Sequence, residues 1–450
     1  MPYRTAPVAT SKMPPGIPFI IGNEAAERFS FYGMKAILFV FMTTALLNHA
    51  GAPDLMGEAE ATKWLHIYVA AVYLTPLLGG LLADIWLGKY RAIILLSLLC
   101  CLGHLVLYLD NTRQGLFWGL TLVALGAGGM KPCVASHVGD QFGTSNARLL
   151  PRIYYWFYFA INVGSFLSIL LTPWLRHHHG VHVAFAVPGL FMALATFIFW
   201  LGRHQFAHIP PEPREFLDEL RKPQVLRSLV GLLGIYLFIA MFWSLFDQTA
   251  SRWVSQASRM DLNLLGVTVL PDQLQSVNPA FIMLLIPIFS LVIYPLLGRL
   301  MAVTPLRKIG LGFALAAASF MIPAWVEAWI LAGEKPSIWW QVLAYFLLTG
   351  AEVMISITAL EFSYTQAPAR LKSFIMGLFY ASVFLGNVFT AAVNWSIEKT
   401  GLASNLNGPA YYWFFVKCMA VTTVLFVFVV RFYQGRTYLQ EEKTTPQVLM

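Results

Sequence analysis

Charged side chains are scarce in this sequence. Asp, Glu, Lys and Arg make up only 12% of its 450 residues, whereas hydrophobic residues make up 58%. An average soluble domain carries about twice that share of charge, roughly 25%. So much apolar surface cannot be buried in one aqueous core, so the composition excludes an ordinary soluble globular protein. It predicts instead a chain that lies in the lipid bilayer.

Cysteine is also rare. Cys100, Cys101, Cys133 and Cys418 all fall in apolar stretches, with no CxxC pair and no histidine at metal-binding spacing. We interpret them as small buried hydrophobic residues and expect no disulfide, no metal and no cofactor. A net charge of +8 would suggest nucleic acid in a soluble protein. In a membrane protein the placement of the charges matters more, and we expect no nucleic-acid partner.

Long apolar stretches dominate the chain. A helix needs about 20 apolar residues to cross a bilayer. Stretches of about that length predict an all-α membrane protein with twelve transmembrane helices, at 17–47, 62–86, 90–109, 115–139, 152–174, 182–202, 228–250, 278–302, 306–331, 338–366, 371–398 and 410–433. The polar segment 1–16 lacks the features of a cleavable signal peptide, so we expect the first stretch to stay in the membrane.

Basic residues are distributed unevenly between the loops. With twelve spans, nineteen Lys and Arg residues lie on the side of both termini, seven lie on the other side and four lie inside spans. Because basic loops stay in the cytoplasm, both termini are predicted to be cytoplasmic, in the inner (plasma) membrane. We expect five parts: a cytoplasmic N-terminus (1–16), a six-helix bundle (17–202), a cytoplasmic linker (203–227), a second six-helix bundle (228–434) and a cytoplasmic tail (435–450).

The two predicted bundles show a faint internal repeat. The sequence Leu-Leu-Gly-Gly-Leu at 77–81 is echoed by Leu-Leu-Gly-Arg-Leu at 296–300, after the second and the eighth predicted helix. The linker is rich in proline and charge, and 215–221 could form a short amphipathic helix. Two such halves favour the major facilitator fold, in which the binding site lies between them at mid-membrane.

The first predicted helix carries a polar face. At 100° per residue its polar positions fall within about 140° of one another. They are Glu24, Glu27, Arg28, Tyr32 and Lys35, and the ring of Phe31 lies on the same face. A charge at the bilayer centre costs about 2.5–3.5 kcal/mol, so this face requires partners or a water-filled cavity. A salt-bridge stripe that only joins helices is the structural alternative.

Three further charged residues lie inside other predicted helices or at their ends. Lys131 follows a run of glycines where backbones can approach closely, and its partner must come from another helix, with Glu24, Glu27 and Glu352 as candidates. Asp247 lies in the seventh predicted helix and Glu352 in the tenth. Acids in the second half and bases in the first, namely Lys35 and Lys131, can form gating salt bridges in one conformation and break them in another.

Histidines offer a possible proton site. His66 and Tyr73 lie seven residues apart on one face of the second predicted helix. Histidine titrates near neutral pH, so His66 could take up a proton, although a lone histidine near a helix end is often structural. A run of histidines in a predicted exterior loop is interpreted as solvated rather than metal-binding: His177, His178, His179 and His182.

Taken together, these residues resemble the proton-dependent oligopeptide transporter family, and we expect a bacterial member. The family signature ExxERFxYYG appears at 24–33 with Phe31 in place of the first tyrosine, GGxxADxxxGxY appears at 79–90, and FYxxINxGS appears at 157–165. Further matches lie at 128–132, 242–248, 278–279 and 360–364. The resemblance therefore covers both halves, and the first and third signatures together are highly specific.

The resemblance implies roles that spacing alone does not. It implies a proton-coupling cluster of Glu24, Glu27, Arg28 and Lys131, joined by His66 facing Asp247. It implies that the peptide carboxylate is held by Arg28, Tyr32, Lys35 and Lys131. It further implies that the peptide ammonium group is held by Asn162, Asn278 and Glu352, and that side-chain pockets are lined by Tyr73, Trp243 and Phe379.

Some positions depart from the family pattern. Lys35 stands where many members have Arg, which removes bidentate carboxylate binding. Asp247 replaces Glu, and Phe379 replaces the Trp of many bacterial members. The linker is too short for the two extra helices found in many of those members. These changes leave the side-chain preference of the site open.

The expected function is proton-coupled import of di- and tripeptides by alternating access. The expected partners are peptides, protons and the bilayer, and the chain is expected to work as a monomer. The alternative is a transporter of the same fold for nitrate, an amino acid or a peptide-like drug, although the intact ExxER motif favours peptides. We expect no enzyme, because neither a paired-aspartate nor a His-Glu metal motif is present. A third hypothesis is a receptor of the same fold that binds its ligand without transporting it.

Overall fold

Long apolar helices make up almost all of the structure. The computed structural model describes residues 3–8, 10–143, 145–146, 149–211, 221–365, 372–399 and 405–432. Within these residues all twelve predicted stretches are helical, which confirms the all-α class. Most of the helix predicted at 215–221 and the whole tail 435–450 lie outside the described residues.

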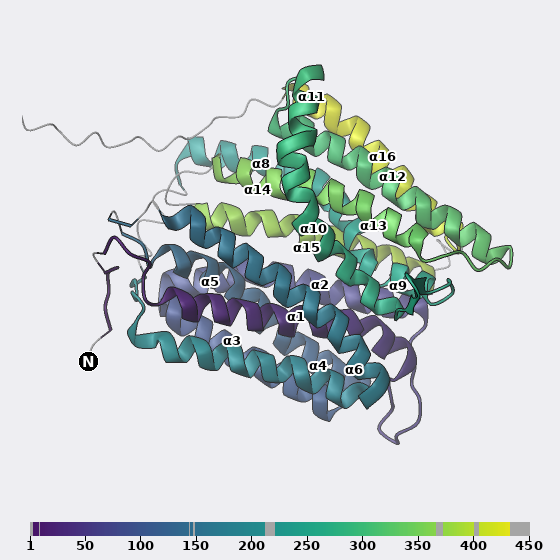
Figure 1. Cartoon of the computed structure of the whole chain (residues 1–450), viewed down its shortest axis with the longest axis horizontal. Coiled ribbons are helices and arrows are strands. Elements are labelled where there is room, and N and C mark those ends of the chain that lie inside the picture. Colours follow the sequence, from purple (N-terminus) through teal and green to yellow (C-terminus); the bar gives the residue numbers. More distant parts are fainter. Residues whose placement is uncertain are drawn as a thin grey trace, which may run out of the picture.

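The first bundle contains six helices in the labelling of Figure 1: α1 (Ile17–Thr44), α2 (Glu58–Leu81), α3 (Lys89–Leu109), α4 (Arg113–Val123), α5 (Gly129–Gly139) and α6 (Leu150–Leu201). The π-helical turn Leu82–Leu87 extends α2, and the π-helical turn Ala124–Gly128 joins α4 to α5. A short 3₁₀ turn, Gly202–His204, follows α6. We call α1 to α6 the N-terminal bundle.

The second bundle begins with α8 (Pro223–Phe246), a 3₁₀ turn (Asp247–Ala250) and α9 (Arg252–Ala257). A small hairpin of β1 (Asn263–Leu264) and β2 (Val267–Thr268) turns through Leu265 and Gly266, both with positive φ. The remaining elements are the 3₁₀ turn Pro271–Ser276, α10 (Val277–Ile288), the π-helical turn Phe289–Ile293, α11 (Tyr294–Leu300), α12 (Pro305–Leu331), α13 (Trp339–Glu352), the π-helical turn Val353–Ile357, α14 (Thr358–Thr365), α15 (Lys372–Lys399) and α16 (Pro409–Phe432). We call these the C-terminal bundle.

Ten helices in the described residues are long and apolar enough to cross a membrane. Helix α1 is not among them, since it carries Glu24, Glu27, Arg28 and Lys35. The stretches predicted as separate helices at 152–174 and 182–202 are joined in α6. There Gly180 has φ 84° and ψ 174°, a backbone conformation outside the helical region. The chain therefore changes direction at Gly180, where the absence of a Cβ makes a positive φ inexpensive.

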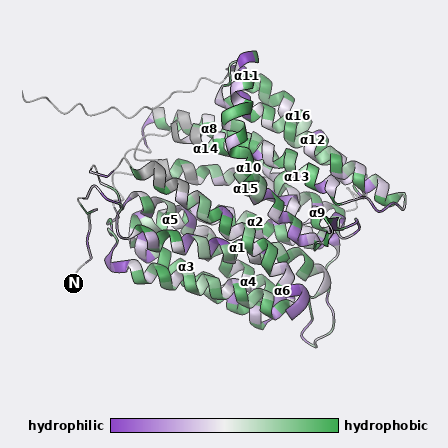
Figure 2. Ribbon diagram, in the orientation of Figure 1, coloured by the Kyte–Doolittle hydropathy of each residue, from purple (hydrophilic) through white to green (hydrophobic). Residues whose placement is uncertain are grey.

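The bundles lie side by side, each with its own apolar core (Figure 1). Figure 2 shows that the long helices are mostly hydrophobic, with hydrophilic residues gathered near the helix ends and loops. Large apolar side chains also point outward, for example Leu98 on α3 and Val421 and Phe428 on α16, each more than half exposed. A bilayer is the solvent that suits this surface, so the chain is a multi-pass membrane protein.

Candidate functional site

The polar face of α1 is buried between the bundles. Glu24 and Glu27 are 2% exposed and Arg28 is 8% exposed. The Arg28 Nε lies 2.7 Å from Glu24 Oε1, to which it donates a hydrogen bond, and 3.0 Å from Glu27 Oε2. Neither Glu27 oxygen accepts a hydrogen bond within the described residues. One guanidinium therefore lies between two carboxylates, and only one of them is hydrogen-bonded to it.

Close packing of α5 against α2 positions Lys131. A Cβ at Gly79 of α2 would collide with the backbone of Gly129, so a glycine is needed at position 79 for the helices to approach this closely. Two residues later on α5, the Lys131 ammonium lies 4.0 Å from the ring centroid of Phe31 and 4.6 Å from that of Tyr73. These distances are those of cation–π contacts.

Lys131 does not contact any of the carboxyl groups expected as its partner, namely those of Glu24, Glu27 and Glu352. No ion pair of Lys131 occurs among the residues that the structure describes, and its cation–π contacts with Phe31 and Tyr73 take that place. The gating pair of Lys131 with Glu352 is not formed in this conformation either. Glu352 instead accepts a hydrogen bond of 2.7 Å from Asn278 on α10, whose amide also donates to Thr349.

One cavity of about 290 Å³ lies between the bundles and joins the predicted binding residues. All nine residues predicted to bind a peptide line it: Tyr32, Lys35, Tyr73, Lys131, Asn162, Trp243, Asn278, Glu352 and Phe379. Glu24 and Arg28 line it as well, whereas Glu27, His66 and Asp247 do not. The N-terminal bundle contributes the basic groups, and the C-terminal bundle contributes Glu352.

The other predicted gating pair is formed. Lys35 Nζ lies 2.8 Å from Asp247 Oδ1, and the two side chains are 11% and 4% exposed. This contact joins α1 to the end of α8. It is the only one of the predicted cross-bundle pairs that the described residues contain in this conformation.

His66 does not contact Asp247 directly, which corrects the expected pairing. Asn387 of α15 lies between them, because α15 packs against both α2 and α8. The Asn387 amide donates to Asp247 Oδ2 at 2.8 Å, so its oxygen accepts from His66 Nδ1 at 2.6 Å. The other ring nitrogen of His66 lies 3.2 Å from the Ser251 hydroxyl. The result is a buried chain of polar groups from His66 through Asn387 and Asp247 to Lys35.

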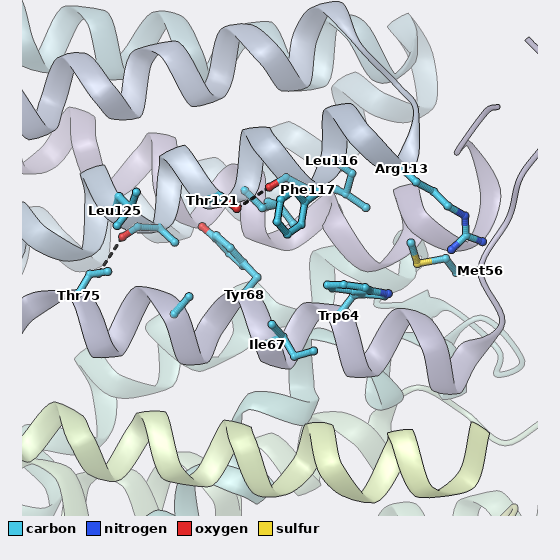
Figure 3. Close-up of a pocket in the computed structure, with 13 residues that line it drawn as sticks. Met56, Trp64, Ile67, Tyr68, Thr75, Arg113, Leu116, Phe117, Thr121 and Leu125 are labelled. Atoms are coloured by element: carbon cyan, nitrogen blue, oxygen red, sulfur yellow. Dashed lines mark hydrogen bonds between the residues drawn. The ribbon is translucent and has the colours of Figure 1, made fainter. Parts of the chain in front are cut away.

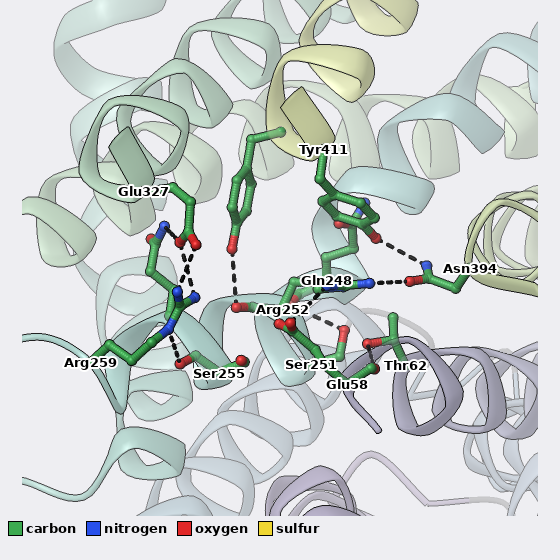
Figure 4. Close-up of polar contacts among 12 residues, drawn as sticks. Glu58, Thr62, Gln248, Ser251, Arg252, Ser255, Arg259, Glu327, Asn394 and Tyr411 are labelled. Atoms are coloured by element: carbon green, nitrogen blue, oxygen red, sulfur yellow. Dashed lines mark hydrogen bonds and ion pairs between the residues drawn. The ribbon is translucent and has the colours of Figure 1, made fainter. Parts of the chain in front are cut away.

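Further ion pairs join the bundles at one end of the molecule, where α1 ends at Thr44 and α2 begins. We call it the Thr44 end. Arg252 lies 2.9 Å from Glu58 of the N-terminal bundle, donates to Asn394 of α15 at 2.7 Å and lies over the Tyr411 ring (Figure 4). Two more pairs join the bundles at this end: Lys63 with Glu398 at 2.5 Å and Arg176 with Asp272 at 3.1 Å. Together with Lys35–Asp247, these are the cross-bundle ion pairs among the residues that the structure describes, and all lie toward this end.

Several residues of the site were not predicted. Tyr380 lines the cavity, with its ring centroid 5.7 Å from that of Tyr73. Asn387 and Asn394 belong to a polar stripe at helical spacing on α15, with Thr390 between them, and all three are fully buried. That stripe in an otherwise apolar helix was a visible signal. Its partners could not be read from the sequence, because they come from other helices.

The fold and the site define a multi-pass helical membrane protein with a charged central cavity between two bundles. A profile of the POT family matches residues 90–222 and 215–414. The chain belongs to this family. Solved structures agree: a crystal structure of an auto-inhibited POT family peptide transporter has a TM-score of 0.87 and 33% identity, covering 95% of this chain and 99% of that one.

Several curated relatives are animal proteins. Peptide transporter family 1 of Drosophila melanogaster is 37% identical over 70% of this chain and 48% of its own length. Solute carrier family 15 member 2 of Oryctolagus cuniculus is 34% identical over 84% of this chain and 58% of its own length. The chain thus spans about half the length of these relatives. Their names are those of transporters and not of enzymes, and they give no support to the expected bacterial origin.

Proposed function

We propose that this protein imports di- and tripeptides together with protons by alternating access. The observation that carries the proposal is the cavity between the bundles. Its N-terminal wall carries three basic groups beside Glu24 and is therefore positive on balance, whereas its C-terminal wall carries the carboxyl group of Glu352. Free peptides carry the complementary pair of charges at their two ends. The names of the curated relatives, which include a peptide transporter, support the same substrate class.

In the membrane we propose twelve crossings in two six-helix halves, 17–202 and 228–434. Ten candidate spans are supplemented by α1, whose charges face the cavity, and by a second crossing within Phe159–His204. That segment has 46 residues, about 69 Å at 1.5 Å per residue, which is twice a bilayer core. Both termini lie in the cytoplasm, as the basic loops favour, and the plasma membrane is the proposed location, with the monomer as the working unit.

For peptide binding, we assign the carboxylate to the basic groups on the N-terminal bundle. Arg28, Lys35 and Lys131 line that side of the cavity, with the Tyr32 hydroxyl among them. Lys131 has only aromatic rings as close partners in the described structure, so a carboxylate would be its first ionic partner. Charge-assisted hydrogen bonds of this kind are about twice as strong as neutral ones.

The peptide ammonium group is assigned to the opposite wall. Glu352 is the carboxylate on that side, and Asn278 already bonds it, which holds the acceptor in place. Asn162 of α6, in the N-terminal bundle, adds a polar side chain to the same cavity. Tyr73, Trp243 and Phe379 would surround the peptide side chains, and aromatic walls of this kind accept residues of many shapes.

Proton coupling is assigned first to Glu27. Its carboxylate is 2% exposed and accepts no hydrogen bond within the described residues. A buried ionised carboxylate without donors is costly, whereas a protonated one is not. A proton on Glu27 would weaken its hold on Arg28 and so release a basic group for the peptide carboxylate. His66 would share the coupling through Asn387, since the chain of hydrogen bonds reaches Asp247 and then Lys35.

Alternating access would follow from the breaking of the pairs between the bundles. We propose that the Thr44 end faces the outside, opposite the cytoplasmic termini, and that its four ion pairs hold the cavity closed on that side in this conformation. Protonation near Asp247, or competition for Lys35 by a peptide carboxylate, would loosen this end. The bundles would then rock about the cavity and expose it to the other side.

The test is uptake of labelled dipeptides into proteoliposomes with and without an imposed pH gradient. Lys131→Ala is expected to abolish proton-driven uptake, because it removes the ammonium group that receives the peptide carboxylate. The control Lys335→Ala alters an exposed lysine in a loop and should keep wild-type uptake. Full proton-driven uptake by Lys131→Ala contradicts the scheme. Competition by nitrate or a free amino acid, without competition by dipeptides, would instead favour another substrate.

A further inference from the structure

A second hollow lies away from the central cavity, on the membrane-facing side of the N-terminal bundle between α2 and α4. It offers about 210 Å³, and its lining residues are Met56, Trp64, Ile67, Tyr68, Ala71, Thr75, Arg113, Leu116, Phe117, Leu120, Thr121, Ala124 and Leu125. Figure 3 shows Arg113 and Met56 at one end, the rings of Trp64, Tyr68 and Phe117 along it, and Thr75 and Leu125 at the other end. We call it the α2–α4 groove.

The interior of the groove suits a hydrocarbon chain. Its walls are almost entirely apolar, and Ile67, Phe117 and Leu125 are each 40–50% exposed, so the groove is open toward lipid. The hydroxyl groups of Thr75 and Thr121 donate to backbone carbonyls, whereas the buried hydroxyl of Tyr68, which also lines the groove, has no hydrogen-bond partner in the described residues. None of its residues lines the central cavity, so an occupant would not compete with a peptide.

The length of the groove matches one leaflet of a bilayer. From Trp64 to Thr75 along α2 the rise is about 16 Å, half of the roughly 30 Å hydrocarbon core. Trp64 lies at the Arg113 end, and tryptophan favours the boundary between lipid and water. That end therefore lies at the depth of lipid headgroups, and the Thr75 end lies near the middle of the membrane.

Charges at the Arg113 end select the headgroup. Arg113 Nε lies 2.7 Å from Asp54 and its Nη1 lies 2.6 Å from Glu60, while the three side chains are 23–38% exposed. A guanidinium has five N–H donors, and these contacts use two of them. One cation next to two carboxylates gives this mouth a net charge of −1. It can bind a phosphate through Arg113 and an ammonium group through the carboxylates, and it disfavours a lipid of net negative charge.

We propose that the α2–α4 groove binds one phospholipid with an ammonium headgroup, of the phosphatidylethanolamine class. One acyl chain lies along Tyr68 and Phe117, and the headgroup contacts Arg113, Asp54 and Glu60. The protein thus carries a lipid site in the leaflet next to the Thr44 end. This site is independent of which substrate crosses the central cavity.

The groove is tested with the purified, delipidated full chain in detergent, to which dioleoyl phosphatidylethanolamine is added before native mass spectrometry. Ala71→Phe fills the groove from α2, and Thr121→Phe fills it from α4. Both are expected to reduce the singly lipid-bound population about ten-fold. The matched control is Leu102→Phe on α3, where the Leu102 side chain is 48% exposed and faces lipid. This variant should retain the phospholipid. If either groove variant retains as much lipid as the wild type and has an unchanged melting temperature, the proposal is overturned.

The headgroup is tested by competition between phosphatidylethanolamine and phosphatidylglycerol of the same acyl chains. The wild type should retain the ethanolamine lipid preferentially. Glu60→Gln changes the mouth from a net charge of −1 to neutral, so the preference should fall by up to about five-fold, the range of an exposed ion pair. Preferential or equal retention of phosphatidylglycerol by the wild type overturns the headgroup assignment, as does an unchanged preference in Glu60→Gln.

Discussion

Replacing Lys35 with alanine removes the ammonium group that faces Asp247 between the bundles. The Asp247 carboxylate is then left 4% exposed with one remaining side-chain donor, the amide of Asn387. In contrast, Asp247→Ala leaves Lys35 at the edge of the cavity, where water can reach it. We therefore expect Lys35→Ala to weaken the closed arrangement of the Thr44 end more than Asp247→Ala does.

The magnitude follows from the burial of the pair. Removing one partner of a buried ion pair costs about 3–5 kcal/mol, because the other charge stays buried and uncompensated. Taking the lower figure for this partly exposed pair, about 3 kcal/mol corresponds to a shift of roughly 100-fold in the ratio of closed to open arrangements. The double variant Lys35→Ala/Asp247→Ala removes the stranded charge, so it should recover much of this loss.

The assay is a distance distribution between spin labels at Ala50 and Lys335, exposed positions in loops of the two bundles at the Thr44 end. The four cysteines are first replaced by serine. The wild type should give mainly the short distance, and Lys35→Ala should give mainly the longer one. An unchanged distribution in Lys35→Ala, or a double variant that opens further than either single variant, would refute the assignment of this pair as a closing contact.

Two further variants test separate parts of the molecule. Asn387→Leu breaks the chain between His66 and Asp247 and leaves both without that hydrogen-bond partner. Proton-driven dipeptide uptake should therefore fall about ten-fold, while pH-independent counterflow changes less. Equal losses of uptake and counterflow would contradict a proton-linked role. Glu327→Gln weakens the two contacts of 2.7 and 3.0 Å with Arg259 inside the C-terminal bundle. It should cost about 2 kcal/mol and lower the melting temperature, with uptake per folded molecule unchanged; an unchanged melting temperature would contradict this.

The helices were predictable because their signal is local. The stretches predicted from apolar length are helical in the described residues. The spacing of 100° per residue put Glu24, Arg28 and Lys35 on the face of α1 that lines the cavity, although Glu27 does not reach it. The joining of two stretches in α6 was not predictable, since it depends on the backbone of a single glycine, Gly180. Nor were α9 and the β1–β2 hairpin, which lie in a loop without apolar periodicity.

Side-chain partners between helices were harder to predict. The nine residues predicted to bind a peptide line one cavity, but Lys131 was expected to meet a carboxylate and instead lies over Phe31 and Tyr73. His66 was expected to face Asp247, and Asn387 was overlooked. Each helix face can be read from its own sequence. Which two faces meet, and in which conformation, is decided by packing that the spacing of one helix does not contain.

With the Thr44 end on the outside, as we propose, the four ion pairs there also bear on how strongly an external substrate would bind. Each stabilises the arrangement in which that end is closed, so a resting population biased by about 3 kcal/mol would leave under one molecule in a hundred open to the outside. The affinity measured from outside would be weaker than the intrinsic affinity by that same fraction. A modest external affinity would then report the cost of opening this end rather than a poor fit in the cavity.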